Sequence, residues 1–264
     1  MKTSETPTTT KKRNPVLWVP TAYFGMGLPF VVLNMVAVLM YKGLGVSDAK
    51  IAFWTSLIML PWTLKPLWSP LLEMYRTKKF FVVLTQMVSG ITFGLIALSL
   101  HLPSFFAVTI ALFAVVAFSG ATHDVACDGV YMDELNAQEQ AKYIGWQGAF
   151  YNVAKIIGTG VLVYLAGALK DAYDGPSEDA VLYSWTIIMI VLGVVMFSLG
   201  LYHTRMLPSG KHARSVTSFS ESMTELWSVI RNFFTKKHIL YYICFIILYR
   251  FAEGFVMKIV PLFL

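Results

Sequence analysis

Ionisable side chains interrupt the long apolar segments of this sequence, at positions where a charge is costly. A charged residue at the centre of a lipid bilayer costs about 3 kcal/mol on insertion scales, so its presence needs a functional or structural reason. The residues concerned are Lys65, His123, Asp124, Asp128, Lys155, Arg250, Glu253 and Lys258. The carboxylates among them can exchange protons, and the cations can bind an anionic solute.

Arg250 and Glu253 are three residues apart, so a helix places them on one face. Counted from the expected cytoplasmic end, Lys155 and Arg250 lie about 18 Å deep and Glu253 about 22 Å deep. Transporters hold their solutes and coupling ions at this depth. We expect Glu253 to exchange a proton, while Arg250 modulates it or binds an anionic group. The alternatives are a self-neutralising pair for Arg250 and Glu253 and a snorkelling side chain for Lys155.

Asp124 and Asp128 are four residues apart, which places both carboxylates on one helix face. They lie nearer the expected cytoplasmic end, as does Lys65, and we expect them to gate the protein rather than contact the solute. After the second apolar segment come Glu73, Arg76, Lys78 and Lys79. They resemble the loop 2–3 motif of the major facilitator superfamily, and the resemblance implies a conformational latch. The alternative for this connection is the basic flank of a cytoplasmic loop.

A group of polar and aromatic side chains lies near these charges and is expected to line a solute cavity. It consists of Tyr23, Trp146, Tyr151 and Asn152. Aromatic residues at such positions also serve as interface anchors or as packing, which is the alternative for this group.

His123 and Asp128 also match H-x4-D, the spacing of acyltransferases in which a histidine acts as general base. Two residues at this spacing occur often by chance, and the sequence has no Gly-rich phosphate-binding motif. A membrane-embedded acyltransferase is therefore only the alternative class, and we expect neither enzyme activity nor a cofactor. Cys127 and Cys244 indicate neither a disulfide framework nor a metal site.

The composition places these residues in a membrane protein. Of the 264 residues, 56% are hydrophobic and 14% are charged, whereas a soluble domain has about 25% charged residues. The 44 residues from 80 to 123 contain no Asp, Glu, Lys or Arg, which is enough for two crossings of about 20 residues each. A soluble enzyme, a nucleic-acid-binding domain and a secreted disulfide module all fit poorly.

Seven apolar segments are long enough to cross a bilayer. They cover residues 16–41, 49–70, 80–101, 103–123, 143–168, 181–204 and 238–264. The runs are continuous rather than alternating, which favours helices over a β-barrel. The sequence therefore predicts an all-α polytopic membrane protein.

Basic residues predict the orientation and the domain organisation. The tail and the connections on its side hold 14 Lys and Arg, against three on the other side, so the N-terminus is expected in the cytoplasm. The expected parts are a tail (1–15), a six-span bundle (16–204), a cytoplasmic connector with an amphipathic helix (205–237) and a seventh span (238–264). Because the sequence stops within an apolar run, we expect it to be the first part of a longer six-plus-six transporter.

Four short patterns resemble one transporter family. They are GMGLP at 25–29, KPLWSPLLE at 65–73, ATHDVACDG at 121–129 and YRFAE at 249–253. Together they are similar to the muropeptide permease and acetyl-CoA transporter branch of the major facilitator superfamily. The resemblance implies a monomer in the inner (plasma) membrane that imports a solute with protons, without nucleic acid. The implied solute is an N-acetylated amino-sugar compound such as an anhydromuropeptide; another sugar, a peptide or an acyl-CoA solute is the alternative.

The sequence also departs from this family at several positions. Glu73 and Glu253 stand where Asp is usual, and His123 stands where Gln is common. The Tyr-Arg pair of the fifth span is replaced by Tyr151 and Asn152, and Lys155 supplies a cation one turn later. The Gly-Pro signature of antiporters does not occur in this span, which disfavours drug efflux.

Overall fold

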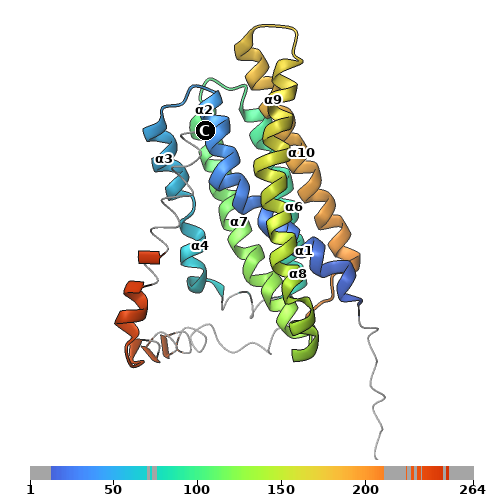
Figure 1. The fold of residues 1–264 in the computed structure, drawn as a ribbon, viewed down its shortest axis with the longest axis vertical. Coiled ribbons are helices and arrows are strands. Elements are labelled where there is room, and N and C mark those ends of the chain that lie inside the picture. The colour runs from blue at the N-terminus through green and yellow to red at the C-terminus, as the bar shows by residue number, and fades with distance from the viewer. Residues whose placement is uncertain are drawn as a thin grey trace, which may run out of the picture.

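The described part of the chain is built from helices joined by short turns (Figure 1). The computed structural model describes residues 13–69, 72, 76–210, 224, 227–228, 231–232, 234–245 and 248–249. Within these residues it contains no strand, and the predicted all-α fold is confirmed. Among the described residues, five helices are long and apolar enough to cross a membrane. They are Pro15–Gly43, Lys78–Ser99, Phe105–Glu134, Ala137–Asp171 and Asp179–Met206.

The first crossing helix starts at a capped N-terminus and changes its hydrogen-bond pattern midway. It consists of α1 (Pro15–Val31), the π-helical turn η1 (Val32–Val36) and α2 (Ala37–Gly43). Asn14 caps it by accepting a hydrogen bond from the Val16 backbone N–H, and Pro15 suits the first helical position. Pro29 lies within α1 and lacks the N–H that an α-helix interior uses, and the wider turn follows it directly.

The predicted second span, 49–70, is divided in the structure. It forms α3 (Asp48–Leu57), α4 (Leu60–Leu64) and the 3-10 turn η2 (Lys65–Leu67). Pro61 and Pro66 have no backbone N–H, so the carbonyls of Leu57 and Trp62 cannot receive their usual helical hydrogen bonds. The prolines therefore interrupt a segment that hydropathy alone marks as one span.

The remaining helices match the predicted segments in order but not in length. They are α6 (Lys78–Ser99), α7 (Phe105–Glu134), α8 (Ala137–Ile156), the π-helical turn η3 (Ile157–Leu162), α9 (Val163–Asp171) and α10 (Ser177–Met206). The apolar segment 103–123 covers only part of its helix, because α7 continues to Glu134. Hydropathy ends at the first charge, whereas the helix continues because its polar side chains have partners, as described below.

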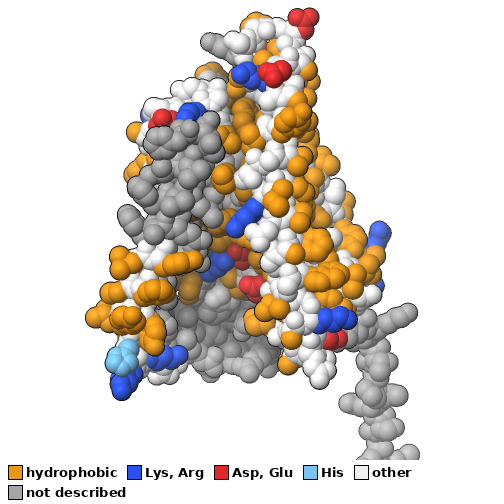
Figure 2. Space-filling model, viewed as in Figure 1, with side chains coloured by type: hydrophobic (Ala, Val, Ile, Leu, Met, Phe, Trp, Pro, Cys, Tyr) orange, Lys and Arg blue, Asp and Glu red, His pale blue; other side chains and the backbone are white. Residues whose placement is uncertain are grey.

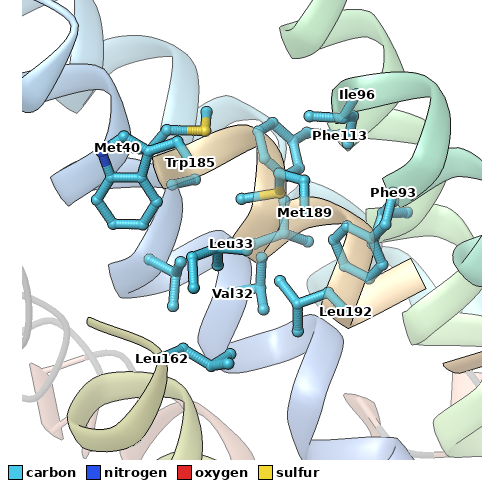
Figure 3. Close-up of a cluster of buried hydrophobic side chains, with 14 of the residues drawn as sticks. Val32, Leu33, Met40, Phe93, Ile96, Phe113, Leu162, Trp185, Met189 and Leu192 are labelled. Atoms are coloured by element: carbon cyan, nitrogen blue, oxygen red, sulfur yellow. The ribbon is translucent and has the colours of Figure 1, made fainter. Parts of the chain in front are cut away.

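The helices pack around two clusters of buried apolar side chains, with α6 lying against both α7 and α10 and α1 lying against α7 and α8. At Gly90 a Cβ atom would lie 2.7 Å from the Phe197 backbone nitrogen, so α6 and α10 approach closely only because this side chain is absent. The core side chains interdigitate between these helices (Figure 3). Those labelled there are Val32, Leu33, Met40, Phe93, Ile96, Phe113, Leu162, Trp185, Met189 and Leu192.

Candidate functional site

A hollow on one face of the molecule collects charged side chains. Figure 2 shows acidic and basic groups gathered between α4 and α8, and much of the described surface beside them is hydrophobic or uncharged. Such a grouping is unusual on an apolar bundle, because each charge must be balanced or hydrated. The residues described next come from α1, α4, η2, α7 and α8, and they form the candidate site.

An ion pair joins the broken second segment to the middle of α7. Lys65 Nζ lies 2.7 Å from Asp124 Oδ2, and Trp62 Nε1 donates to the same oxygen at 2.8 Å. The side chains of Lys65 and Asp124 are 27% and 11% exposed. Asp124 Oδ1 is buried and has no hydrogen-bond partner among the described residues. The structure thus brings together two of the residues expected to gate the protein.

Two Gly-x3-Asp steps on α7 explain how these partners reach their carboxylates. A Cβ atom on Gly120 would lie 2.9 Å from the Trp62 ring, and one on Gly129 would lie 2.5 Å from Lys78 Cδ. One turn later, Asp124 receives Trp62 and Lys65, and Asp133 lies 3.1 Å from Lys78 Nζ. Each glycine leaves room for the side chain that its neighbouring aspartate binds. Sequence reasoning missed Asp133; it assigned Lys78 to the expected latch with Glu73 and Arg76, with a basic flank as the alternative.

Asp128 pairs with α1 rather than with Lys65. The Tyr23 hydroxyl donates to Asp128 Oδ1 at 2.9 Å, and the Tyr23 ring meets Tyr131 edge-on at 5.9 Å between centroids. The charge network expected for Asp124, Asp128 and Lys65 is therefore divided in this structure. Its halves are an ion pair to η2 and a hydroxyl–carboxylate contact to α1.

The third part of the site is an aromatic bridge across the hollow. Phe30 on α1 lies 5.6 Å from the Trp62 ring and 6.1 Å from the Tyr151 ring, between centroids. Lys155 Nζ lies 4.9 Å from the centroid of Tyr151, a cation–π distance. The bridge thus connects α4 to α8 and carries a cation at its α8 end.

The other residues expected in the cavity lie apart from this bridge or use their polar groups locally. Asn152 is exposed, and its amide donates to the Gly148 carbonyl of its own helix at 2.8 Å. Trp146 packs against the rings of Tyr143 and Phe150 on α8.

The residues expected in the latch and the coupling pair are only partly visible. Arg76 lies over the Phe80 ring at 5.6 Å and not beside Asp124. Glu73, Arg250 and Glu253 lie outside the described residues, so their roles stay predictions.

A buried polar chain links four helices, and sequence reasoning did not find it. Thr21 Oγ1 and His203 Nε2 are 2.9 Å apart, and His203 Nδ1 donates to Gln86 Oε1 at 2.7 Å. Gln86 Nε2 donates to His123 Nε2 at 3.0 Å. The available signal was a glutamine and a histidine inside otherwise apolar runs.

The hydrogen bonds of this buried polar chain also test the H-x4-D pattern of His123 and Asp128. His123 Nε2 is occupied by Gln86, and His123 Nδ1 has no partner among the described residues. The Asp128 carboxylate accepts from Tyr23 instead. The two residues therefore do not form the hydrogen-bonded base and acid that an acyltransferase needs.

Helical spans and a charged hollow between them are features of transporters, and comparison with known families is decisive. Residues 21–264 match the model of the Major Facilitator Superfamily. The chain belongs to this superfamily. With its spanning helices, it is a multi-pass membrane protein. An uncharacterized protein of Haemophilus influenzae (strain ATCC 51907 / DSM 11121 / KW20 / Rd) is 25% identical over 241 residues, which are 88% of this chain and 52% of that relative. The chain thus spans about half the length of this relative.

Proposed function

We propose that this major facilitator protein is a secondary active transporter that imports a solute with protons by alternating access. The observation that carries the proposal is the hollow between α4 and α8. There the Lys65–Asp124 pair, the Tyr23–Asp128 contact and Lys155 are grouped on an otherwise apolar bundle. Intramembrane charges of this kind mark solute and ion pathways.

The Lys65–Asp124 pair is proposed as a gate. The pair joins η2, in the proline-broken second segment, to the long helix α7. If α4 and η2 move relative to α7, the pair breaks; if they stay in place, it remains formed. In a surrounding of low dielectric constant the two charges attract each other strongly, and leaving one of them buried without its partner costs free energy. Such a contact favours one of two arrangements, as alternating access requires.

Lys155, Tyr151 and Phe30 are proposed to receive the solute. The rings offer flat apolar faces, and the Lys155 ammonium offers a positive charge for a carboxylate. An N-acetylated amino-sugar compound such as an anhydromuropeptide has the complementary groups: sugar rings that stack on aromatic faces and a carboxylate that pairs with the ammonium. The resemblance of four sequence patterns to the muropeptide permease branch supports this choice; another sugar, a peptide or an acyl-CoA solute is the alternative within transport.

Coupling is proposed to lie at Glu253, with Arg250 beside it in the seventh span (238–264). The bundle (16–204) and the connector (205–237) precede this span. The described positions of the connector from 224 to 234 are helical, which supports its amphipathic helix. The basic side of the protein, with the N-terminus and the connector, is proposed to face the cytoplasm from the inner membrane, and the protein is proposed to act as a monomer.

The test is exchange in proteoliposomes without any gradient. Purified protein should exchange a labelled anhydromuropeptide across the membrane, and unlabelled solutes of the same class should compete. A panel containing a plain sugar, a peptide and an acyl-CoA separates the alternatives. Exchange of one of those solutes and not of the amino-sugar compound would correct the solute. No exchange of any of them would contradict the transporter proposal for this solute range.

The enzyme alternative gains no support from the site. His123 is 1% exposed and bound to Gln86, so it is poorly placed to take a proton from an acyl acceptor. Turnover of an acyl donor by the purified protein, lost in His123→Ala, would overturn this conclusion.

A further inference from the structure

A long apolar groove runs along a second face of α7, apart from the charged hollow. Two cavities of about 620 and 630 Å³ share Ala114 as a lining residue. The first lies between α3, α4 and α7, and the second lies between α6, α7 and the two residues Trp68 and Leu72 that follow η2. Thr122 lines the groove whereas Asp124 faces Lys65, and residues two apart lie about 200° around a helix. The groove is therefore separate from the candidate solute site.

The groove exists because the side chains of its floor are small and the helix that forms its wall is interrupted. Ala107, Ala111 and Ala114 form the floor on α7, where larger side chains would fill the space. The opposite wall contains Ile58 and Pro61, at the point where the second segment turns and restarts. A straight helix at this position would pack more closely against α7.

The shape and polarity of the groove match a lipid acyl chain. From Ala107 to Thr122 the α7 backbone rises about 22 Å, at 1.5 Å per residue, and the hydrocarbon core of a bilayer is about 30 Å thick. Most of the lining is aliphatic or aromatic, including Leu57, Leu84 and Phe118. A polar solute would lose its hydration here without compensation.

One end of the groove is suited to an anionic headgroup. Arg76 lies over the Phe80 ring at 5.6 Å, and Phe80 contacts Phe81, which lines the second cavity, at 5.5 Å between centroids. The helix α6 begins at Lys78, and a helix N-terminus attracts negative charge. Arg76 and this helix end thus place positive potential at the mouth of the second cavity.

A tryptophan ring forms part of the wall of the same cavity. Trp68 lines the cavity and packs on Phe118 at 4.8 Å between ring centroids. Its indole Nε1 is buried and has no hydrogen-bond partner among the described residues. Because this nitrogen is buried, the indole takes part in the cavity through its ring rather than through its N–H.

We propose that this groove binds one phospholipid with an anionic headgroup, taken from the leaflet on the side of Arg76. The phosphate lies at Arg76 and the start of α6, and an acyl chain passes the Trp68 ring and extends along α7. Basic sites between helices on this side of a membrane protein are suited to anionic lipids. The proposal does not depend on transport or on the identity of the solute.

The test uses tryptophan quenching by phosphatidylglycerol with brominated acyl chains, added to the purified protein in detergent. Saturable quenching is expected at several-fold lower lipid concentration than with brominated phosphatidylcholine. Trp68→Phe should remove most of the saturable part, because Trp68 lines the groove. Equal curves for the two lipids would overturn the proposal.

Two charge variants locate the headgroup. Arg76→Gln should abolish the preference for phosphatidylglycerol, whereas Lys50→Gln should keep it, because Lys50 lines the other cavity. An unchanged preference in Arg76→Gln would overturn the proposed headgroup position. Inorganic phosphate should not displace the lipid at matched concentration; if it does, the site binds free phosphate instead.

A third variant tests the groove itself. Ala114→Phe should fill the space shared by the two cavities and remove saturable quenching by both lipids. Its fold is checked by thermal unfolding, and Arg76→Gln, an exposed substitution, keeps the test valid if Ala114→Phe does not fold.

Discussion

Lys65 and Asp124 form an ion pair of 2.7 Å between a segment broken by two prolines and the middle of a long, continuous helix. Trp62 donates to the same carboxylate oxygen, and Gly120 leaves the space in which the indole lies. Asp133, Lys78 and Gly129 repeat this arrangement about two and a half turns further along α7, in simpler form. Helix α7 therefore forms two ion pairs with the same local geometry. The Lys78–Asp133 pair serves as a control for the Lys65–Asp124 pair.

Asp124→Asn should lower the free energy of unfolding by about 1–3 kcal/mol, because it leaves the Lys65 ammonium without its counter-charge. Thermal unfolding in detergent measures the loss. A double variant, Lys65→Met with Asp124→Asn, should recover part of it and give a coupling free energy of at least about 0.5 kcal/mol. Strict additivity of the two substitutions would show that the pair contributes nothing.

The gating role is tested with the two pairs together. Asp124→Asn should change the rate of solute exchange more than Asp133→Asn, because only the first pair reaches the broken segment of the hollow. Exchange rates are compared after both variants are shown to insert in equal amounts. An equal effect of the two substitutions would assign both pairs a purely structural role.

Gly120→Val should destabilise the protein by about 1–3 kcal/mol, since even a Cβ at this position lies 2.9 Å from the Trp62 ring. The control is Gly145→Ala, where a Cβ meets nothing within 4 Å. This control should be neutral or stabilising by up to about 1 kcal/mol, because Ala favours a helix over Gly. Similar losses in both variants would contradict the role of Gly120 as space for Trp62.

Lys155→Gln should weaken solute binding about tenfold, as loss of a charged hydrogen bond of about 1.4 kcal/mol predicts. Lys142→Gln is the matched control, because Lys142 lies over the Tyr143 ring at 5.3 Å on the same helix but outside the bridge. Binding is measured by competition in the exchange assay. If the control weakens binding as much as Lys155→Gln, the cation of the bridge does not contact the solute.

Gln86→Leu should lower the free energy of unfolding by about 1–3 kcal/mol or more, because it removes the partner of two buried histidines at once. Thr92→Val on the same helix is the control. Thr92 is buried and donates only to the Val88 carbonyl of its own helix among the described residues, so its loss should be small. Stability is followed by thermal unfolding, and equal losses would show that the four-helix polar chain adds nothing.

The sequence predicted the class of fold, and the order of the apolar segments, because hydropathy and length report directly on bilayer crossing. It did not predict where helices end. Hydropathy ended the fourth apolar segment at 123, although the spacing of Asp124 and Asp128 already favoured a helix beyond it; each of these carboxylates, and Asp133, has a partner from another element. Pro61, which lacks a backbone N–H, could have predicted the break in the second segment. Hydropathy did not, because it is averaged over a window longer than the break.

The partners within the candidate site were only partly predictable. Lys65 and Asp124 stood out because charges in apolar runs are few. The Tyr23–Asp128 contact and the Gln86 bridge depend on how helices are rotated against one another, which a single sequence without tertiary contacts does not specify. The sequence does repeat the spacing Gly-x3-Asp at Gly120 and Gly129, and this repeat could have identified Asp133 as a second paired carboxylate.

Proton-driven uptake by Glu253→Gln tests the central proposal most directly. Glu253 is the mid-membrane carboxylate proposed to carry the proton, and Gln removes its charge while nearly keeping its shape. Vesicles with an imposed pH gradient and labelled anhydromuropeptide are compared for the natural protein and the variant, at equal amounts inserted. We predict that the natural protein accumulates solute and that Glu253→Gln does not, although it keeps part of its gradient-free exchange. Accumulation by Glu253→Gln at the natural level would contradict proton coupling at this residue and reduce its pairing with Arg250 to a structural contact.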